Sequence, residues 1–139
     1  MKKLSEKLFV SGQIQTADLE AIAQAGVKTV INNRPDGEMP GQPSGDSIRI
    51  AAEALGLNYH AIPVAGGFSM DQVEAVREIL ASDKTPALAF CASGTRSSIL
   101  WSLSQAGEMD IEDILSATEA SGYNLRQYAP MIESVKKSL

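Results

Sequence analysis

Residues 86–101, Pro-Ala-Leu-Ala-Phe-Cys-Ala-Ser-Gly-Thr-Arg-Ser-Ser-Ile-Leu-Trp, contain an uncharged apolar run, the only cysteine of the chain and a segment with helical apolar spacing. The run 87–90 is short and uncharged, as expected of a strand buried on both faces of a parallel sheet. The small residues 92–95 permit a tight turn of the backbone. Apolar residues recur at helical spacing over 96–105. The stretch therefore predicts a strand, a tight loop and a helix.

Strand and helix patterns also alternate along the rest of the chain. We predict strands at 8–10, 27–31, 57–63 and 87–90. We predict helices at 16–24, 47–55, from residue 69 onward, and at 96–105, 110–120 and 124–137. Thr16 is the expected cap of the first helix, and Ser69 and Gln72 form an expected capping box. Such alternation implies right-handed crossovers and a mostly parallel sheet. We expect an α/β fold with a central sheet of about four to five strands flanked by helices, in a single domain over residues 1–139.

Cys91 lies at the carboxyl end of the predicted central strand, where electrostatics favour the thiolate. Loop N–H groups, the dipole of the following helix and the charge of Arg96 all stabilise negative charge there. A free thiol has a pKa of about 8.5, which falls to roughly 3.5–7.5 in such settings. The same loop can hold an oxyanion. The residues predicted to bind the anion are Ala92, Ser93, Gly94, Thr95, Arg96 and Ser97.

Two further loops should meet this one, because ligands bind outside the carboxyl ends of the strands in an open α/β sheet. They span 32–45 and 64–68, and the first places Arg34 and Glu38 at the expected rim of the site. Asp36 is the predicted general acid for phosphatase chemistry, although Asp-Gly is also an ordinary turn. We therefore expect Cys91, Arg96 and Asp36 to be the catalytic residues.

The amino-acid composition of the chain argues against several classes of binding partner. The chain has 139 residues, a net charge of −5, one cysteine and one histidine. An acidic chain without a basic stripe argues against nucleic acid or a membrane surface as partner. A lone cysteine excludes an internal disulfide and favours a cytoplasmic setting, and no metal site or cofactor is expected.

Three strings place the chain beside a known family. Residues 10–13 (Val-Ser-Gly-Gln), 30–38 (Val-Ile-Asn-Asn-Arg-Pro-Asp-Gly-Glu) and 91–101 together resemble the phosphatase-like domain of beta-lactamase-hydrolase-like proteins, over about residues 4–107. The resemblance implies a three-layer α/β fold like that of the protein tyrosine phosphatases. In that family the domain occurs alone or fused to a metallo-hydrolase-type domain. A metallo-hydrolase-type, persulfide-processing protein is thus an implied candidate partner.

The resemblance leaves three activities open. The string 91–96 also resembles the active-site loop of the rhodaneses, with four residues between cysteine and arginine, whereas tyrosine phosphatases have five and usually a histidine before the cysteine. The shorter loop favours a sulfurtransferase that takes sulfane sulfur from a small-molecule donor as a Cys91 persulfide. The alternatives are a phosphatase that forms a phosphocysteine from a phosphate ester, and a non-catalytic module that binds an anion or a protein.

Overall fold

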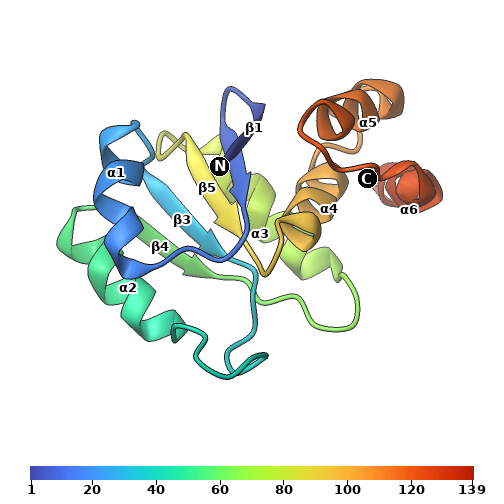
Figure 1. Ribbon diagram of the computed structural model, residues 1–139. Helices are drawn as coiled ribbons and strands as arrows, with labels where there is room; N and C mark the ends of the chain where they lie inside the picture. Colours follow the sequence, from blue (N-terminus) through green and yellow to red (C-terminus); the bar gives the residue numbers. More distant parts are fainter.

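The computed structural model describes residues 1–139 and contains a five-stranded sheet between layers of helices (Figure 1). The strands are β1 (Lys2–Ser5), β2 (Leu8–Ser11), β3 (Thr29–Asn32), β4 (Asn58–Ala61) and β5 (Ala87–Phe90); the helices are α1 (Leu19–Gln24), α2 (Gly45–Ala54), α3 (Met70–Ala81), α4 (Thr95–Ser104), α5 (Ile111–Ala120) and α6 (Ala129–Lys137), with 3₁₀ turns η1 (Thr16–Asp18) and η2 (Arg126–Tyr128). None of the helices has the length and apolar content needed to span a membrane.

The sheet has the order β1-β2-β5-β3-β4, and only the β1–β2 pair is antiparallel. The apolar run of β5 lies between β2 and β3, and all four of its residues are buried. This confirms the α/β prediction with a mostly parallel sheet. Because β5 is central, the residue that follows it, Cys91, lies in the middle of the carboxyl edge.

Two hydrophobic clusters hold the three layers together. One joins the sheet to α1 and α2 through buried residues such as Leu19, Val30 and Ile48. The larger joins the opposite face to α3, α4, α5 and α6, and includes Trp101. Figure 1 shows α1 and α2 on one side of the sheet and the other four helices on the opposite side. Burial on both faces supplies most of the stabilising free energy of such a fold.

The strand predictions are least accurate toward the edges of the sheet, where one strand was missed and another is shorter than predicted. Strand β1 was not predicted, because the Lys2–Ser5 segment has two exposed lysines and buries only Leu4. Ser11, expected in a turn, ends β2. At the other edge β4 is shorter than the predicted 57–63, and its side chains are mostly exposed. Edge strands lose half of their burial, so the apolar pattern that identifies central strands is weak there.

The helix predictions hold for α3, where Ser69 and Gln72 form the expected capping box. They are wrong at Thr16, because Gln15 precedes the helical turn and its N–H donates to Asp18 Oδ2 at 2.8 Å. Helix α2 begins earlier than predicted, at Gly45, and Leu55 just beyond its end is exposed rather than on the apolar face.

The predicted helix 124–137 is two elements. The 3₁₀ turn η2 comes first, and α6 begins at Ala129 with Pro130 in its first turn. Proline suits that position because the N–H it lacks would have no partner within the helix.

Candidate functional site

The Cys91 thiol lies at the base of the loop that joins β5 to α4. The backbone N–H of Gly94 donates to its sulfur, with an N···S distance of 3.1 Å, and the N–H of Cys91 donates to Ser11 O at 3.3 Å. Gly94 has φ +94°, a conformation that favours glycine, and no side chain caps α4 at this position. The N–H of Gly94, at the N-cap of α4, is therefore directed at the thiol, and the next N–H, that of Thr95, donates over a longer distance of 3.4 Å to Ser93 Oγ.

The surroundings of the Cys91 thiol act on its pKa in opposite directions. Burial raises the pKa, because it penalises the charged thiolate. Hydrogen bonds from Ser97 and from the backbone of Ser93 and Gly94 lower it, and the net effect is a pKa below the usual value of a thiol. The predicted preference for the thiolate is therefore supported by this geometry.

Arg96 is oriented by a carboxylate and a carbonyl group. Its Nη1 donates to Glu38 Oε2 at 2.7 Å and to Val64 O at 2.9 Å, and its Nη2 donates to Glu38 Oε1 at 2.9 Å. These contacts use three of the five N–H donors of the guanidinium. The Nε–H and the second Nη2–H lie on the same side of the group and donate to no oxygen or nitrogen atom of the protein, and the Cys91 sulfur lies close enough to raise the pKa of Arg96. Two such N–H groups form the fork that binds an oxyanion through two parallel bonds.

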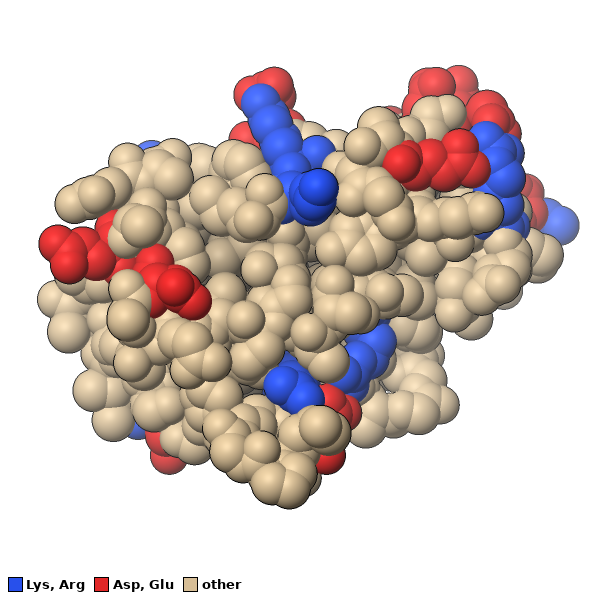
Figure 2. Space-filling view, viewed as in Figure 1, with Lys and Arg blue, Asp and Glu red and all other residues tan.

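Glu38 links the two arginines of the site. Arg34 Nε donates to Glu38 Oε1 at 2.9 Å, and Arg34 Nη1 donates to Gln13 Oε1 at 3.1 Å. Hydrogen bonds from Arg96 and Arg34 lower the pKa of Glu38 to about 2, so it is ionised at neutral pH. Figure 2 shows such a small mixed group of basic and acidic side chains near the carboxyl edge of the sheet. The structure thus brings the predicted rim residues Arg34 and Glu38 to Arg96.

The segment after β2 supports the loop from the other side. A Cβ atom on Gly12 would lie 3.0 Å from Ala92 O, so only glycine fits without displacing the loop. The N–H of Gln13 donates to the same carbonyl oxygen at 3.3 Å. Gly12 and Gln13 were not predicted to belong to the site, although both lie in the string 10–13 that carries the family resemblance.

Asn33 was also missed, and it joins three elements beneath the loop. Its side chain accepts a hydrogen bond from Ser97 Oγ at 2.8 Å and donates to Ile62 O at 2.8 Å, and its N–H donates to Phe90 O. Asn33 and Ser97 are almost fully buried. A hydroxyl group has one proton, so Ser97 donates either to Asn33 or, after the hydroxyl turns about its Cβ–Oγ bond, to the sulfur.

Asp36 has a different neighbourhood from the one predicted for a general acid. Its Oδ1 accepts a hydrogen bond from the N–H of Gly45 at 2.8 Å, beside the start of α2. It makes no hydrogen bond to Cys91, Arg96 or the loop between them. The contacts of Asp36 therefore close the 32–45 loop and give no support to its predicted catalytic role.

The side chains of Ser93 and Thr95 bond to each other, with an O···O distance of 3.0 Å; Ser93 is exposed and Thr95 is partly buried. Their hydroxyl groups make no hydrogen bond to Cys91. Ala92 has no polar side chain, and its carbonyl oxygen accepts the hydrogen bond from the N–H of Gln13. Within residues 92–95, the polar groups left for the predicted anion site are therefore those of the backbone.

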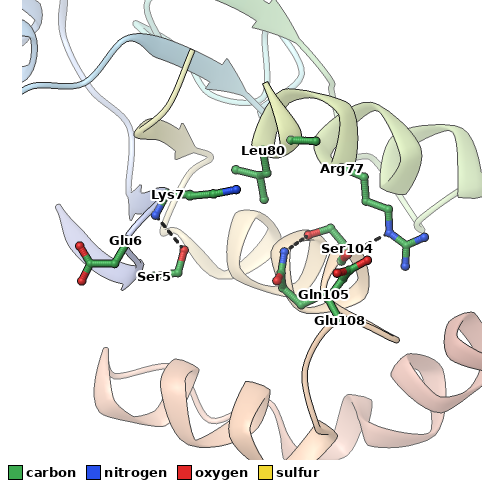
Figure 3. A pocket seen from close by; sticks show the side chains of 9 residues that line it. Ser5, Glu6, Lys7, Arg77, Leu80, Ser104, Gln105 and Glu108 are labelled. Carbon is green, nitrogen blue, oxygen red and sulfur yellow. Dashed lines mark hydrogen bonds between the residues drawn. The ribbon is translucent and has the colours of Figure 1, made fainter. Parts of the chain in front are cut away.

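One surface hollow lies away from Cys91. It has a volume of about 420 Å³ and is lined by the turn between β1 and β2 and by the ends of α3 and α4 (Figure 3). There Arg77 donates to Ser104 O and Ala106 O, which satisfies carbonyl groups at the end of α4. Since α4 starts at the Cys91 loop, this hollow lies at the opposite end of the helix from the thiol.

Comparison with protein families and curated proteins agrees with this geometry. The sequence profile described as "Beta-lactamase hydrolase-like protein, phosphatase-like domain" matches residues 1–108. A beta-lactamase hydrolase-like protein of Xylella fastidiosa strain 9a5c is 33% identical over 133 residues, which is 94% of this chain and 31% of that protein. The chain therefore spans about a third of the length of this curated relative.

Solved structures with the same fold are described as phosphatases. A candidate phosphatase of Neisseria meningitidis Z2491 is 36% identical, with a TM-score of 0.84 over 96% of both chains. The active form of Tk-PTP is 17% identical, with a TM-score of 0.74 over 99% of this chain and 97% of that one, and shows the fold alone. These comparisons confirm the expected phosphatase-like α/β fold. They favour the phosphatase alternative over sulfur transfer, which none of these relatives is described as performing.

Proposed function

The chain belongs to the phosphatase-like domain family of the beta-lactamase hydrolase-like proteins, and from this membership we propose that it hydrolyses phosphate esters through a phosphocysteine at Cys91. The observation that carries the proposal is the pairing of a thiol that accepts a hydrogen bond from Gly94 with an arginine whose two remaining N–H groups can bind two phosphoryl oxygens. Sulfur transfer, which the four-residue spacing favours, is not named in the descriptions of the relatives reported above.

In the first step the Cys91 thiolate attacks phosphorus. The S–P bond forms as the ester P–O bond breaks, and the leaving oxygen takes a proton from water. Negative charge on the phosphoryl oxygens is stabilised by the Nε–H and the second Nη2–H of Arg96 and by the loop amides. The guanidinium needs little reorganisation, because Glu38 and the carbonyl group of Val64 already hold it. Glu38 keeps the arginine in place for this step.

In the second step water attacks the phosphocysteine. A P–O bond forms and the S–P bond breaks, which releases inorganic phosphate and restores the thiolate. The hydrogen bonds that lower the pKa of Cys91 also make its sulfur a better leaving group. Ser97 adds to this stabilisation when its hydroxyl turns from Asn33 to the sulfur.

The leaving group receives little help from the protein. Glu38 is the only carboxylate that contacts Arg96 or the loop, and a pKa of about 2 keeps it ionised and unable to donate a proton. General acid catalysis commonly contributes about 10²–10⁴-fold to such reactions. We therefore infer that esters with weakly basic leaving groups, such as 4-nitrophenyl phosphate, are hydrolysed much faster than alkyl phosphates.

The experiment is an assay of 4-nitrophenyl phosphate hydrolysis by the wild-type chain and by Cys91→Ser, with thiocyanate formation from thiosulfate and cyanide measured in parallel. We expect ester hydrolysis by the wild type and only background hydrolysis by Cys91→Ser, because serine lacks a ready anionic nucleophile. Cysteine-dependent thiocyanate formation without ester hydrolysis would replace this proposal by sulfur transfer. Absence of both activities would leave the non-catalytic anion-binding module.

A further inference from the structure

Tyr123 reaches the Cys91 loop from the connection between α5 and η2, beyond the residues that the family profile matches. Its hydroxyl group donates to the carbonyl oxygen of Ser93, with an O···O distance of 3.1 Å. A Cβ atom on Gly94 would collide with the same hydroxyl group, so the tyrosine packs directly against the loop. The mechanism above gives this contact no role.

The peptide unit between Ser93 and Gly94 gives the contact a consequence for the thiol. In a trans peptide the C=O and N–H groups point in opposite directions. The carbonyl group of this unit accepts the Tyr123 hydrogen bond, while its N–H donates to Cys91 Sγ at 3.1 Å. By holding the carbonyl oxygen outward, Tyr123 holds the N–H toward the sulfur. Glycine at position 94 would otherwise let this peptide rotate easily.

The segment that carries Tyr123 is anchored on several sides. The N–H of Tyr123 donates to Thr118 O at 2.9 Å, and Ser121 Oγ donates to Lys3 O at 3.1 Å. Leu125 is buried in the larger hydrophobic cluster, and Arg126 forms ion pairs with Glu112 and Glu119 on α5. A hydrogen bond from such a fixed donor restricts the loop more than one from a freely moving side chain.

We propose that Tyr123 is a positioning residue that fixes the Ser93–Gly94 peptide and thereby stabilises the Cys91 thiolate. The inference rests on the proposed function, since it assumes that the thiolate is the working form of Cys91. Burial and the nearby charge of Cys91 raise the pKa of Tyr123, which keeps the phenol protonated and able to donate. The other ionisable group in contact with Cys91 is Arg96, with Glu38 and then Arg34 behind it.

The test measures the rate of Cys91 alkylation by iodoacetamide as a function of pH in four proteins: wild type, Tyr123→Phe, Tyr123→Leu and the control Tyr128→Phe. Tyr128 packs against the same cluster and its hydroxyl makes no hydrogen bond, so the control removes an equivalent oxygen from the same region. Because Cys91 is the only cysteine, every alkylation event reports on it. Thermal unfolding of each variant verifies that it is folded.

We expect both Tyr123 variants to raise the apparent pKa of Cys91. At pH values below that pKa, the alkylation rate should fall about fivefold, because one net hydrogen bond contributes a factor of this size to an equilibrium. The control should follow the wild type. If Cys91 in Tyr123→Phe has the same apparent pKa as in the wild type, the inference is overturned and the proposed function stays intact, even if the pKa of Cys91 is shifted in Tyr123→Leu. A wild-type protein with an ordinary thiol pKa would overturn both.

Discussion

Helices α3 and α4 both begin at the carboxyl edge of the sheet, but their first turns are occupied differently. In α3 the hydroxyl group of Ser69 accepts the N–H of Gln72 at 3.2 Å, and the Gln72 side chain accepts the N–H of Ser69 at 2.9 Å. In α4 the corresponding position is Gly94, which has no side chain, and its N–H donates to the sulfur of Cys91. The N-terminus of α3 is thus satisfied by a two-way capping box, whereas α4 presents its N-cap N–H to the thiol and has only a long contact from Thr95 N–H to Ser93 Oγ at 3.4 Å.

The difference shows how a helix N-terminus becomes a site. Both ends carry the same partial positive charge of the helix dipole, yet α3 satisfies it with local side chains. At α4 that charge meets a nucleophile, and Arg96 in the first turn adds a binding fork that Glu38 orients from 58 residues away in the sequence. The open cap needs support from outside the helix, which Gly12, Asn33 and Tyr123 provide.

Removal of Arg96 should have the largest effect on the open end. We expect Arg96→Ala to lower kcat/KM for 4-nitrophenyl phosphate by at least about 10²-fold, because the loss of one group that stabilises transition-state charge costs about 10²–10³-fold. The control is Arg77→Ala, which removes an arginine that contacts only backbone carbonyl groups at the far end of α4. Equal losses in the two variants would show that the effect is one of folding.

Glu38→Gln tests the support behind Arg96. We expect kcat/KM to fall about tenfold, since a shift of a positioning group away from the reacting atoms can cost up to about 10²-fold. Asp46→Asn, an exposed carboxylate in the first turn of α2, serves as control and should leave kcat/KM within twofold. A Glu38→Gln variant with wild-type kinetics would mean that Arg96 needs no carboxylate to be oriented.

The pH dependence of kcat/KM should reflect the lowered pKa of Cys91. The thiolate is present above that pKa and is lost as the pH falls through it, so activity should persist at pH values where an ordinary thiol, with a pKa of about 8.5, is protonated. Glu38, with a pKa of about 2, should add no acid limb above about pH 4. Initial rates measured at constant ionic strength and corrected for the ionisation of the substrate test both expectations.

Ser69→Ala tests the closed end and should have the smallest effect on activity. Loss of an N-cap side chain costs about 1 kcal/mol of stability, so the free energy of unfolding in urea should fall by about this amount. The value of kcat/KM should change less than twofold, because Ser69 makes no contact with the Cys91 loop. A large loss of activity in a folded Ser69→Ala protein would contradict the distinction between the two helix ends.

Short sequence patterns predict the central strand, the loop that follows it and the start of α3 correctly. The apolar run 87–90, the small residues after Cys91 and the Ser69–Gln72 pair each depend on neighbours a few residues apart, and the structure confirms them. Strand β1 was missed because an edge strand with two exposed lysines has almost no apolar alternation.

The support of the site was harder to predict, because it comes from distant parts of the chain. Tyr123 lies 30 residues from its hydrogen-bond partner Ser93, and Asn33 lies 64 residues from Ser97. Nothing in the local spacing of either residue indicates such a contact. The exception is the loop 32–45, whose position at the carboxyl edge of the sheet predicts that its polar residues lie near Cys91. That rule does not distinguish the loop-closing Asp36 from the arginine-binding Glu38.

The central claim is that Cys91 becomes covalently phosphorylated during turnover, and mass spectrometry of the acid-quenched protein tests it most directly. The wild-type chain is mixed with 4-nitrophenyl phosphate and quenched within a few turnovers, beside samples of Cys91→Ser and of wild type treated with thiosulfate. We predict one phosphoryl group on the peptide that contains Cys91, absent from the Cys91→Ser sample. A Cys91 persulfide formed from thiosulfate, with no phosphoryl adduct from the ester, would contradict the account.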